Sequence, residues 1–139
     1  MKSLYLMARI AGRPVGISGD QVESVVDIGA VTPVPGAQRS IRGLTALRSR
    51  VVTVIDSRAA LECENAATST RAVITQVEGH PYAVLVDSVE DVAPFAARPT
   101  LDGVALQGVW RNAAHGIIDR DGEPVLAIDL RAFIPGLSG

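Results

Sequence analysis

The sequence has little cysteine, little lysine and few aromatic residues, and each scarcity excludes a class of protein. Its one cysteine, Cys63, excludes a disulfide within the chain and a zinc site built from several cysteines, and it favours a reducing compartment. One lysine stands against twelve arginines, and the formal net charge of -2 argues against a general binder of nucleic acid or of anionic membranes. No aromatic residue lies among the arginines of positions 39–58, as stacking on RNA bases would require.

Long apolar runs and nucleotide-binding motifs are absent as well. The N-terminal apolar stretch is interrupted by Arg9 and is too short to span a bilayer or to form a signal peptide, so we expect a cytoplasmic protein without membrane insertion. His80 and His115 have no partner at metal-ligand spacing, and neither of the glycine-rich phosphate-binding motifs occurs. We therefore expect no metal, no cofactor and no catalysis.

What the sequence does contain is a series of short apolar runs separated by Gly, Pro, Asp and Ser. Val and Ile dominate them, and turn residues recur about every ten positions, the spacing of a sandwich or barrel. We expect one or two helical turns after Asp56 and after Asp129, each with the Asp as N-cap, and a weaker helical stretch near residues 94–98. The predicted strands are residues 4–10, 14–18, 22–28, 43–47, 51–56, 71–77, 82–87, 104–110, 115–119 and 124–129.

The chain also repeats itself in two ordered blocks. Residues 12–25 and 79–92 share G-x-P-x-x-x-x-x-D-x-V-E-x-V at an offset of 67, and residues 52–61 and 125–134 share V-x-x-I-D-x-R-A-x-[L/I] at an offset of 73. We interpret the repeat as two similar β units, each opening with a hairpin and closing with a strand that runs into a capped helix. Because such small sheets are marginal alone, they should pack on one another around a shared apolar seam.

The stretch VTPVPGAQRSIRGLTALRSRVVTVIDSR (31–58) resembles the central signature of CheW-like domains, which reads roughly P-x-x-I-x-G-V-x-N-L-R-G-x-V-x-P-V-x-D-L-R. VLVDSVEDV (84–92) resembles the family's recurring V-D-x-V-x-x-V, and the likeness covers nearly the whole chain. The positions that match the central signature are Ile41, Gly43, Leu44, Leu47, Arg48, Val52, Val54, Asp56 and Arg58.

The resemblance implies an all-β fold of two pseudo-symmetric, five-stranded SH3-like barrels on a shared hydrophobic seam, with short helical turns after each barrel's last core strand. It implies a single CheW-like domain over residues 1–139 with two intertwined subdomains, one roughly the first half with the C-terminal segment and the other the middle to C-terminal part. It also implies a non-catalytic chemotaxis adaptor that couples the cytoplasmic tips of chemoreceptors to the regulatory domain of a CheA-type histidine kinase.

The resemblance assigns two contact surfaces to residues of this sequence. Alternation along one strand puts two arginines around a small apolar patch, a surface that suits a protein interface, and the family's receptor-contacting arginine falls at Arg48. An ion pair of Arg48 with Asp56 or Glu62 is the structural alternative. The receptor-binding set is Arg48, Arg42, Leu44 and Ala46. The kinase-binding set is Val22, Val25, Gly43 and Leu44.

The central signature also departs from the family pattern. The family's N-L-R-G is A-L-R-S here, with Ala46 in place of Asn and Ser49 in place of Gly. Glycine allows a turn with positive φ, which Ser tolerates poorly. A diverged CheW-fold module that binds another signalling partner is therefore the alternative to receptor coupling.

Two aspartates and two arginines recur at equivalent repeat positions. Arg58 and Arg131 each follow an Asp by two residues, and this recurrence favours a structural role at a strand-to-helix corner. One Asp from each of two lobes is also the arrangement of an aspartic-protease dyad, so a hydrolase is a further alternative. Against it, Asp56 and Asp129 lack the glycine of D-[S/T]-G, and a nearby guanidinium opposes a shared proton. Trp110 is read either as core or as an interface anchor.

Overall fold

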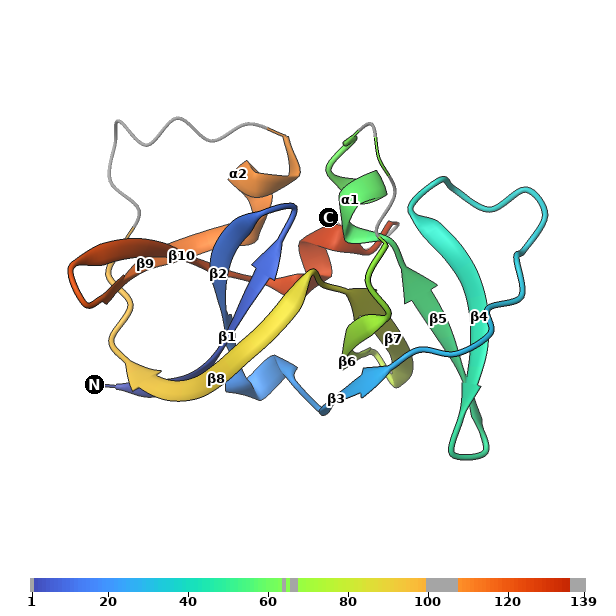
Figure 1. Cartoon of the computed structure of the whole chain (residues 1–139), viewed down its shortest axis with the longest axis horizontal. Coiled ribbons are helices and arrows are strands. Elements are labelled where there is room, and N and C mark those ends of the chain that lie inside the picture. Colours follow the sequence, from blue (N-terminus) through green and yellow to red (C-terminus); the bar gives the residue numbers. More distant parts are fainter. Residues whose placement is uncertain (1, 64, 66–67, 100–107, 136–139) are drawn as a thin grey trace.

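The computed structural model describes residues 2–63, 65, 68–99 and 108–135, and within these ranges the chain forms ten strands and four short helical segments (Figure 1). The strands are β1 (Ser3–Ile10), β2 (Arg13–Ser18), β3 (Ser24–Asp27), β4 (Ile41–Leu47), β5 (Arg50–Ile55), β6 (Arg71–Val77), β7 (His80–Leu85), β8 (Ser88–Phe95), β9 (Ala114–Arg120) and β10 (Glu123–Ile128). The helical segments are η1 (Gly19–Gln21), α1 (Ser57–Ala60), α2 (Val109–Ala113) and η2 (Leu130–Phe133).

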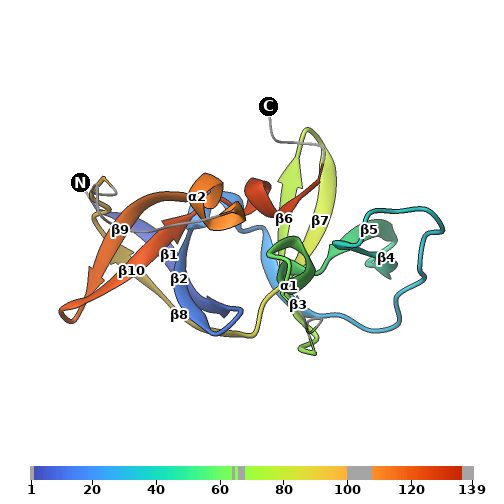
Figure 2. The same ribbon diagram turned by 90° about the horizontal axis from the view of Figure 1, so that it is seen from above.

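The strands form two five-stranded sheets that lie side by side, which we call lobe A and lobe B (Figure 1, Figure 2). Lobe A has the strand order β8-β1-β2-β10-β9, and lobe B has the order β3-β6-β7-β5-β4. Exchanging β1, β2, β8, β9 and β10 for β6, β7, β3, β4 and β5 converts the first order into the second. The sequence repeat is thus a repeat of strand topology, and the predicted all-β fold with two five-stranded units is confirmed.

The two halves of the repeat exchange their closing strands. β10 of the second half pairs in parallel with β2 of the first, and β5 of the first half pairs in parallel with β7 of the second. Lobe B is therefore one continuous segment from β3 to β7, whereas lobe A combines the two N-terminal strands with the three C-terminal ones. The predicted division placed the first half with the C-terminal segment, but the sheets instead place only β1 and β2 of that half in lobe A.

Each sheet is closed by an isolated bridge. In lobe B the segment after β3 bridges to β4, and in lobe A the segment after β8 bridges to β9. Thr32 bridges to Leu44 in lobe B, and Arg98 bridges to Ile117 in lobe A, each through two backbone hydrogen bonds of 2.8–2.9 Å. Gly43 lies against the lobe B bridge with φ of 150°, and a Cβ there would collide with the carbonyl oxygen of Thr32. The close approach explains why this position is glycine.

The largest hydrophobic cluster spans both lobes and forms the predicted seam. Leu6 and Val15 contribute to it from lobe A, and Val73 and Val84 contribute from lobe B, all at most 4% exposed. Separate smaller clusters fill each lobe: Tyr5 and Met7 face the core of lobe A, for example, so β1 alternates between that core and the seam. Each fully buried side chain of this size contributes roughly 1.5–3 kcal/mol. The lobes therefore stabilise one another through the seam.

The strand predictions hold for most of the chain and fail around β8 and α2. Nine predicted strands are present with ends shifted by at most two residues, and α1 and η2 follow their aspartates as predicted. The helical stretch near residues 94–98 is wrong, because Pro94 and Phe95 end β8, a strand that was not predicted. The strand predicted for 104–110 falls largely on residues outside the described ones, and at Val109 and Trp110 it is wrong, because these residues begin α2.

Candidate functional site

The β4–β5 hairpin carries the predicted receptor-binding residues. Its two-residue loop, Arg48 and Ser49, has φ of 47° and 69°, the backbone of a type I′ turn, and Leu47 and Arg50 form the last pair of the ladder. The prediction that Arg48 extends the strand face of β4 is therefore wrong, because Arg48 lies exposed in the turn. Ser49 occupies a position where glycine would be the unstrained residue.

The outer side of this hairpin is apolar and exposed. Leu44 and Ala46 face solvent while Gly43 and Thr45 are buried, which is the alternation that the sequence predicts. On β5, Val51 pairs with Ala46 and is 62% exposed. We call Leu44, Ala46 and Val51 the hairpin face. A contiguous apolar strip of this kind, with an arginine at its end, is typical of surfaces that a protein partner covers.

Arg42 has a structural partner within lobe B. Its Nη2 lies 2.8 Å from Oδ2 of Asp56, whose side chain is 5% exposed. The sequence alternative gave this aspartate to Arg48, but the structure gives it to Arg42. A buried carboxylate that pairs with a guanidinium is costly to disturb. Arg42 therefore ties the start of β4 to Asp56 at the end of β5, and the exposed cation of the predicted receptor-binding set is Arg48.

An ion pair, which we call the ionic clasp, fastens the tip of the same hairpin to Glu23, the residue that precedes β3. Arg50 forms an ion pair with Glu23, and Gln76 on β6 donates a hydrogen bond of 2.5 Å to the same carboxylate. The hydrogen bond from Arg50 lowers the pKa of Glu23, with smaller contributions from Gln76 and from the charge of Arg48. Glu23 is the glutamate of the repeat motif V-E-x-V. The motif therefore includes the residue that pairs with the hairpin.

Lobe A has the equivalent clasp. Glu90, which corresponds to Glu23 in the repeat, pairs with Arg120 at the tip of the β9–β10 hairpin at 3.4 Å, and Asp91 pairs with the same arginine at 3.3 Å. In each lobe an ion pair therefore fastens the hairpin at one end of the sheet order to the other end, just before β3 in lobe B and on β8 in lobe A.

The predicted kinase-binding set is spread over two strands. Val25 lies on β3 and Val22 lies two residues before it, and both are half-buried against the seam. Gly43 and Leu44 lie on β4, and Leu44 bridges to Thr32 in the segment that follows β3. Gly43 is buried beneath Thr32, so Leu44 is the exposed member of the set. Because Leu44 belongs to both predicted sets, the two surfaces adjoin at this residue.

The four residues predicted to be structural form the two strand-to-helix corners. The side chain of Asp56 accepts hydrogen bonds from the backbone N–H of Arg58 and Ala59 at 3.0 and 3.1 Å. The side chain of Asp129 accepts one from the backbone N–H of Arg131 at 2.9 Å. Both aspartates are therefore helix caps.

The two arginines of these corners act differently. Arg58 reaches Asp87 at 3.3 Å, and Asp87 also accepts the backbone N–H of Gly12 at 2.7 Å, so this contact joins α1 of lobe B to the β1–β2 turn of lobe A. Arg131 folds back on Asp129 at 2.6 Å, and its hydrogen bond lowers the pKa of Asp129 to about 2. The first corner therefore connects the two lobes, and the second is held by Arg131 and by Gln21 of η1, whose side-chain amide donates to Asp129 at 2.8 Å and accepts from the backbone N–H of Leu130 at 2.9 Å.

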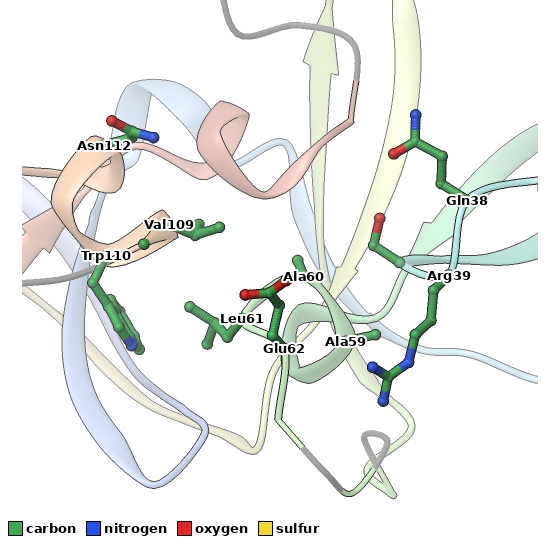
Figure 3. A pocket seen from close by; sticks show the side chains of 11 residues that line it. Gln38, Arg39, Ala59, Ala60, Leu61, Glu62, Val109, Trp110 and Asn112 are labelled. Carbon is green, nitrogen blue, oxygen red and sulfur yellow. The ribbon is translucent and has the colours of Figure 1, made fainter.

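An open hollow of about 520 Å³ lies between α1 and α2. Figure 3 shows Val109 and Trp110 of α2 on one side of it, with Leu61 and Glu62 at the end of α1 opposite. Trp110 also packs edge-on against Phe133, with ring centroids 6.0 Å apart, so it is both a core contact and part of the wall. The sequence did not predict this hollow, because the residues of α2 have the composition of a strand.

No group of three or more His, Cys, Asp or Glu within the described residues is placed to hold a metal ion. No helix in the described ranges has the length and apolar character needed to cross a membrane.

Comparison with known proteins gives consistent results. A family model described as the CheW-like domain matches residues 4–137. The chain is 30% identical over 109 residues to the chemotaxis protein CheW of Rhizobium meliloti (strain 1021), an alignment that covers 75% of this chain and 69% of that protein. The crystal structure of the scaffolding protein TtCheW from Thermoanaerobacter tengcongensis superposes with a TM-score of 0.83 at 22% identity, over 99% of this chain and 97% of that one.

Proposed function

This chain belongs to the CheW-like family, whose members are non-catalytic chemotaxis scaffolds, and from that premise we propose that it couples chemoreceptor tips to a CheA-type histidine kinase. The chain is accordingly a chemotaxis adaptor. The specific proposal is that it holds the cytoplasmic tip of a receptor and the regulatory domain of the kinase at the same time, and that it does so in the cytoplasm, where both partners present these parts.

The observation that carries the proposal is the hairpin face with Arg48 at its end. Leu44 and Val51 are 36% and 62% exposed, which is unusual for large apolar side chains on adjacent strands. Within the described residues Arg48 has no hydrogen bond or ion pair, although its charge reaches Glu23. A receptor tip that offers an apolar side chain and a carboxylate would therefore find partners for both on this hairpin.

We assign the kinase contact to the neighbouring side of lobe B, where β3 begins. Val22 and Val25 are half-buried there, and Leu44 bridges to Thr32, which follows β3 in the chain. Gly43 acts in this assignment through the shape of β4 rather than through contact, because it is buried. Separate surfaces are what an adaptor needs if receptor and kinase are to be bound together.

The receptor contact is tested by Arg48→Glu. We expect this substitution to abolish receptor-dependent control of kinase activity while binding to the isolated kinase regulatory domain is kept. The matched control is Arg111→Glu, because Arg111 is an exposed arginine on α2 of lobe A. Unchanged kinase control in the Arg48 variant, or equal loss in both variants, would contradict the assignment.

The kinase contact is tested by co-purification. The chain and a CheA regulatory domain should elute together at tens of micromolar, and a receptor tip should add to this complex rather than displace the kinase. Displacement would mean that both partners use one surface, and absence of any kinase complex would refute the coupling role.

A CheW-fold module for another signalling partner is the second candidate, because Ala46 and Ser49 replace the Asn and Gly of the family signature. Both replacements fall on the hairpin and turn that present Arg48. The Arg48→Glu experiment separates the two candidates, since only receptor coupling predicts loss of receptor-dependent kinase control.

The hydrolase alternative is wrong. Family membership identifies a non-catalytic scaffold, and the two aspartates serve separate corners of the fold. Asp56 pairs with Arg42, and Asp129 pairs with Arg131, which lowers its pKa to about 2. A shared proton requires one carboxyl with a raised pKa, which is the opposite of the effect at Asp129.

A further inference from the structure

Lobe A has a small apolar groove formed by residues of β2, β9 and β10, which we call the lobe A groove. Its volume is about 250 Å³. It is lined by Arg13, Pro14, Ile117, Pro124, Val125 and Leu126. Proline supplies two of the six lining residues, so part of the wall is a rigid surface that offers no backbone N–H.

The lobe A groove is the counterpart of the hairpin face under the sequence repeat. At the offset of 73, Ile117 and Pro124 correspond to Leu44 and Val51. At the offset of 67, Pro14 on β2 corresponds to a proline on β7. The strands that carry these residues, β2, β10 and β9, also take the places of β7, β5 and β4 in the sheet order. Leu44 and Val51 of the hairpin face thus have apolar counterparts in lobe A, whereas Ala46 is replaced by Asp119.

The two surfaces differ in shape and in charge. In lobe A the surface is hollowed, and its lining residue Arg13 contacts Trp110, whose counterpart at the offset of 73 is Ala37 in lobe B. Arg13 lines the groove, and its guanidinium lies 4.9 Å from the centroid of the Trp110 ring. His80 stands at the corresponding position in lobe B. The groove thus has a fixed positive charge, held in place by an aromatic face.

Arg13 is the only charged residue among those that line the groove. Within the described part of the chain it forms no hydrogen bond or ion pair, and its guanidinium lies over the ring of Trp110. Stacking uses the face of the guanidinium and leaves its in-plane N–H groups to bind a carboxylate. The charge that complements this groove is therefore negative and lies beside an apolar group.

The volume selects the kind of occupant. Pockets for drug-sized molecules and cofactors begin at about 300 Å³, whereas a cavity of about 150 Å³ holds benzene. A groove of about 250 Å³ fits one or two side chains. We propose that the lobe A groove docks an extended segment of a partner protein in which an apolar side chain stands next to an aspartate or glutamate. This inference does not depend on the receptor and kinase assignments above.

The test uses a short peptide and the single tryptophan of the chain. The probe is N-acetyl-Leu-Asp-Leu-amide, titrated to millimolar concentration against the full chain, with Trp110 fluorescence and backbone amide NMR shifts as readouts. We expect saturable changes in Trp110 fluorescence and in the amides of Ile117 and Leu126. N-acetyl-Leu-Asn-Leu-amide, which lacks the charge, should bind about tenfold more weakly or worse.

Arg13→Gln should weaken the aspartyl peptide by the same factor without changing the thermal midpoint, because Arg13 is exposed. Arg111→Gln is the matched control and should bind as the wild type does. Equal binding of the two peptides, equal loss in both variants, or shifts at residues outside the groove would overturn the proposal. Loss of peptide binding in Arg13→Gln with normal kinase control separates this site from the Arg48 surface.

Discussion

Replacing Gly43 with alanine should destabilise the fold by several kcal/mol, and the cause should be the closure of lobe B. The φ of 150° at Gly43 is a backbone conformation that costs an alanine about 1–3 kcal/mol. The added Cβ would also collide with the carbonyl oxygen of Thr32, which accepts a hydrogen bond from the backbone N–H of Leu44, and would disturb the second bond of this bridge, donated by the N–H of Thr32 to the carbonyl of Leu44. Loss of those bonds costs about 1 kcal/mol each.

The sum is about 3–5 kcal/mol, which for a chain of this length lowers the thermal midpoint by roughly 12–20 °C. Two other glycines separate the contributions. Gly79 has φ of 81° with open space around it, so Gly79→Ala should carry backbone strain alone, about 1 kcal/mol. Gly29 lies outside that region of φ and also has open space, so Gly29→Ala should be neutral or stabilising by up to about 1 kcal/mol.

Urea unfolding followed by circular dichroism measures all three variants. A Gly43→Ala value within about 0.5 kcal/mol of Gly79→Ala would refute the collision argument, because both variants carry backbone strain at positive φ and only Gly43→Ala adds a collision. The same variant decides how Gly43 serves kinase binding. Since the residue is buried, kinase binding should fall only in proportion to the unfolded fraction. Weakened binding in fully folded protein would instead show a direct contact.

Two further predictions concern charged side chains. Arg42→Ala should cost about 1–3 kcal/mol in urea unfolding, because its partner Asp56 is buried, whereas Arg71→Ala, which breaks an exposed pair with Asp27, should cost at most about 0.5 kcal/mol. The pKa of Asp129 lies below its ordinary value of 3.8, at about 2, so its contribution to stability is present above pH 4 and is lost as the pH falls toward 2. Asp129→Asn should flatten the stability profile in that window in acid unfolding followed by circular dichroism.

The repeat and the helix caps could be predicted because their signals are local. An Asp followed by a helical turn is recognisable within a few residues, and the caps at Asp56 and Asp129 have that form. The alternation of Leu44 and Ala46 against Gly43 and Thr45 is likewise a property of one strand. These predictions depend only on neighbouring residues, and they agree with the structure.

Three errors have physical causes that the sequence window does not contain. β8 was missed because Glu90 and Asp91 disfavour a strand by composition, whereas pairing with β1 and the ion pairs with Arg120 stabilise it. Trp110 was read as a strand residue because its neighbours have strand composition, whereas its packing on Phe133 holds a helix there. Arg48 was placed on a strand because a two-residue turn of Arg and Ser is an unusual type I′ sequence.

The residues alone could not predict which hairpin each closing strand pairs with, and the reason is a different one. β10 pairs with β2 and β5 pairs with β7, and the hairpins that carry β2 and β7 have the same place in their sheets and share the G-x-P turn of the repeat motif. The local pattern is satisfied by either pairing, and only the long-range connection chooses. The same limit applies to the groove beside Arg13 and to the hollow beside Trp110, which are formed by segments far apart in the chain.

The exchange of closing strands gives the molecule the architecture of a domain-swapped dimer whose two subunits are joined end to end. A chain cut between β5 and β6 would leave β5 without its parallel neighbour and β3 without its antiparallel one. Each fragment could recover those neighbours only from a second polypeptide, so the two fragments should fold by complementation with one another. Ancestry from a half-length gene that formed such a pair, followed by fusion, accounts for both the repeat and the interlocked sheets.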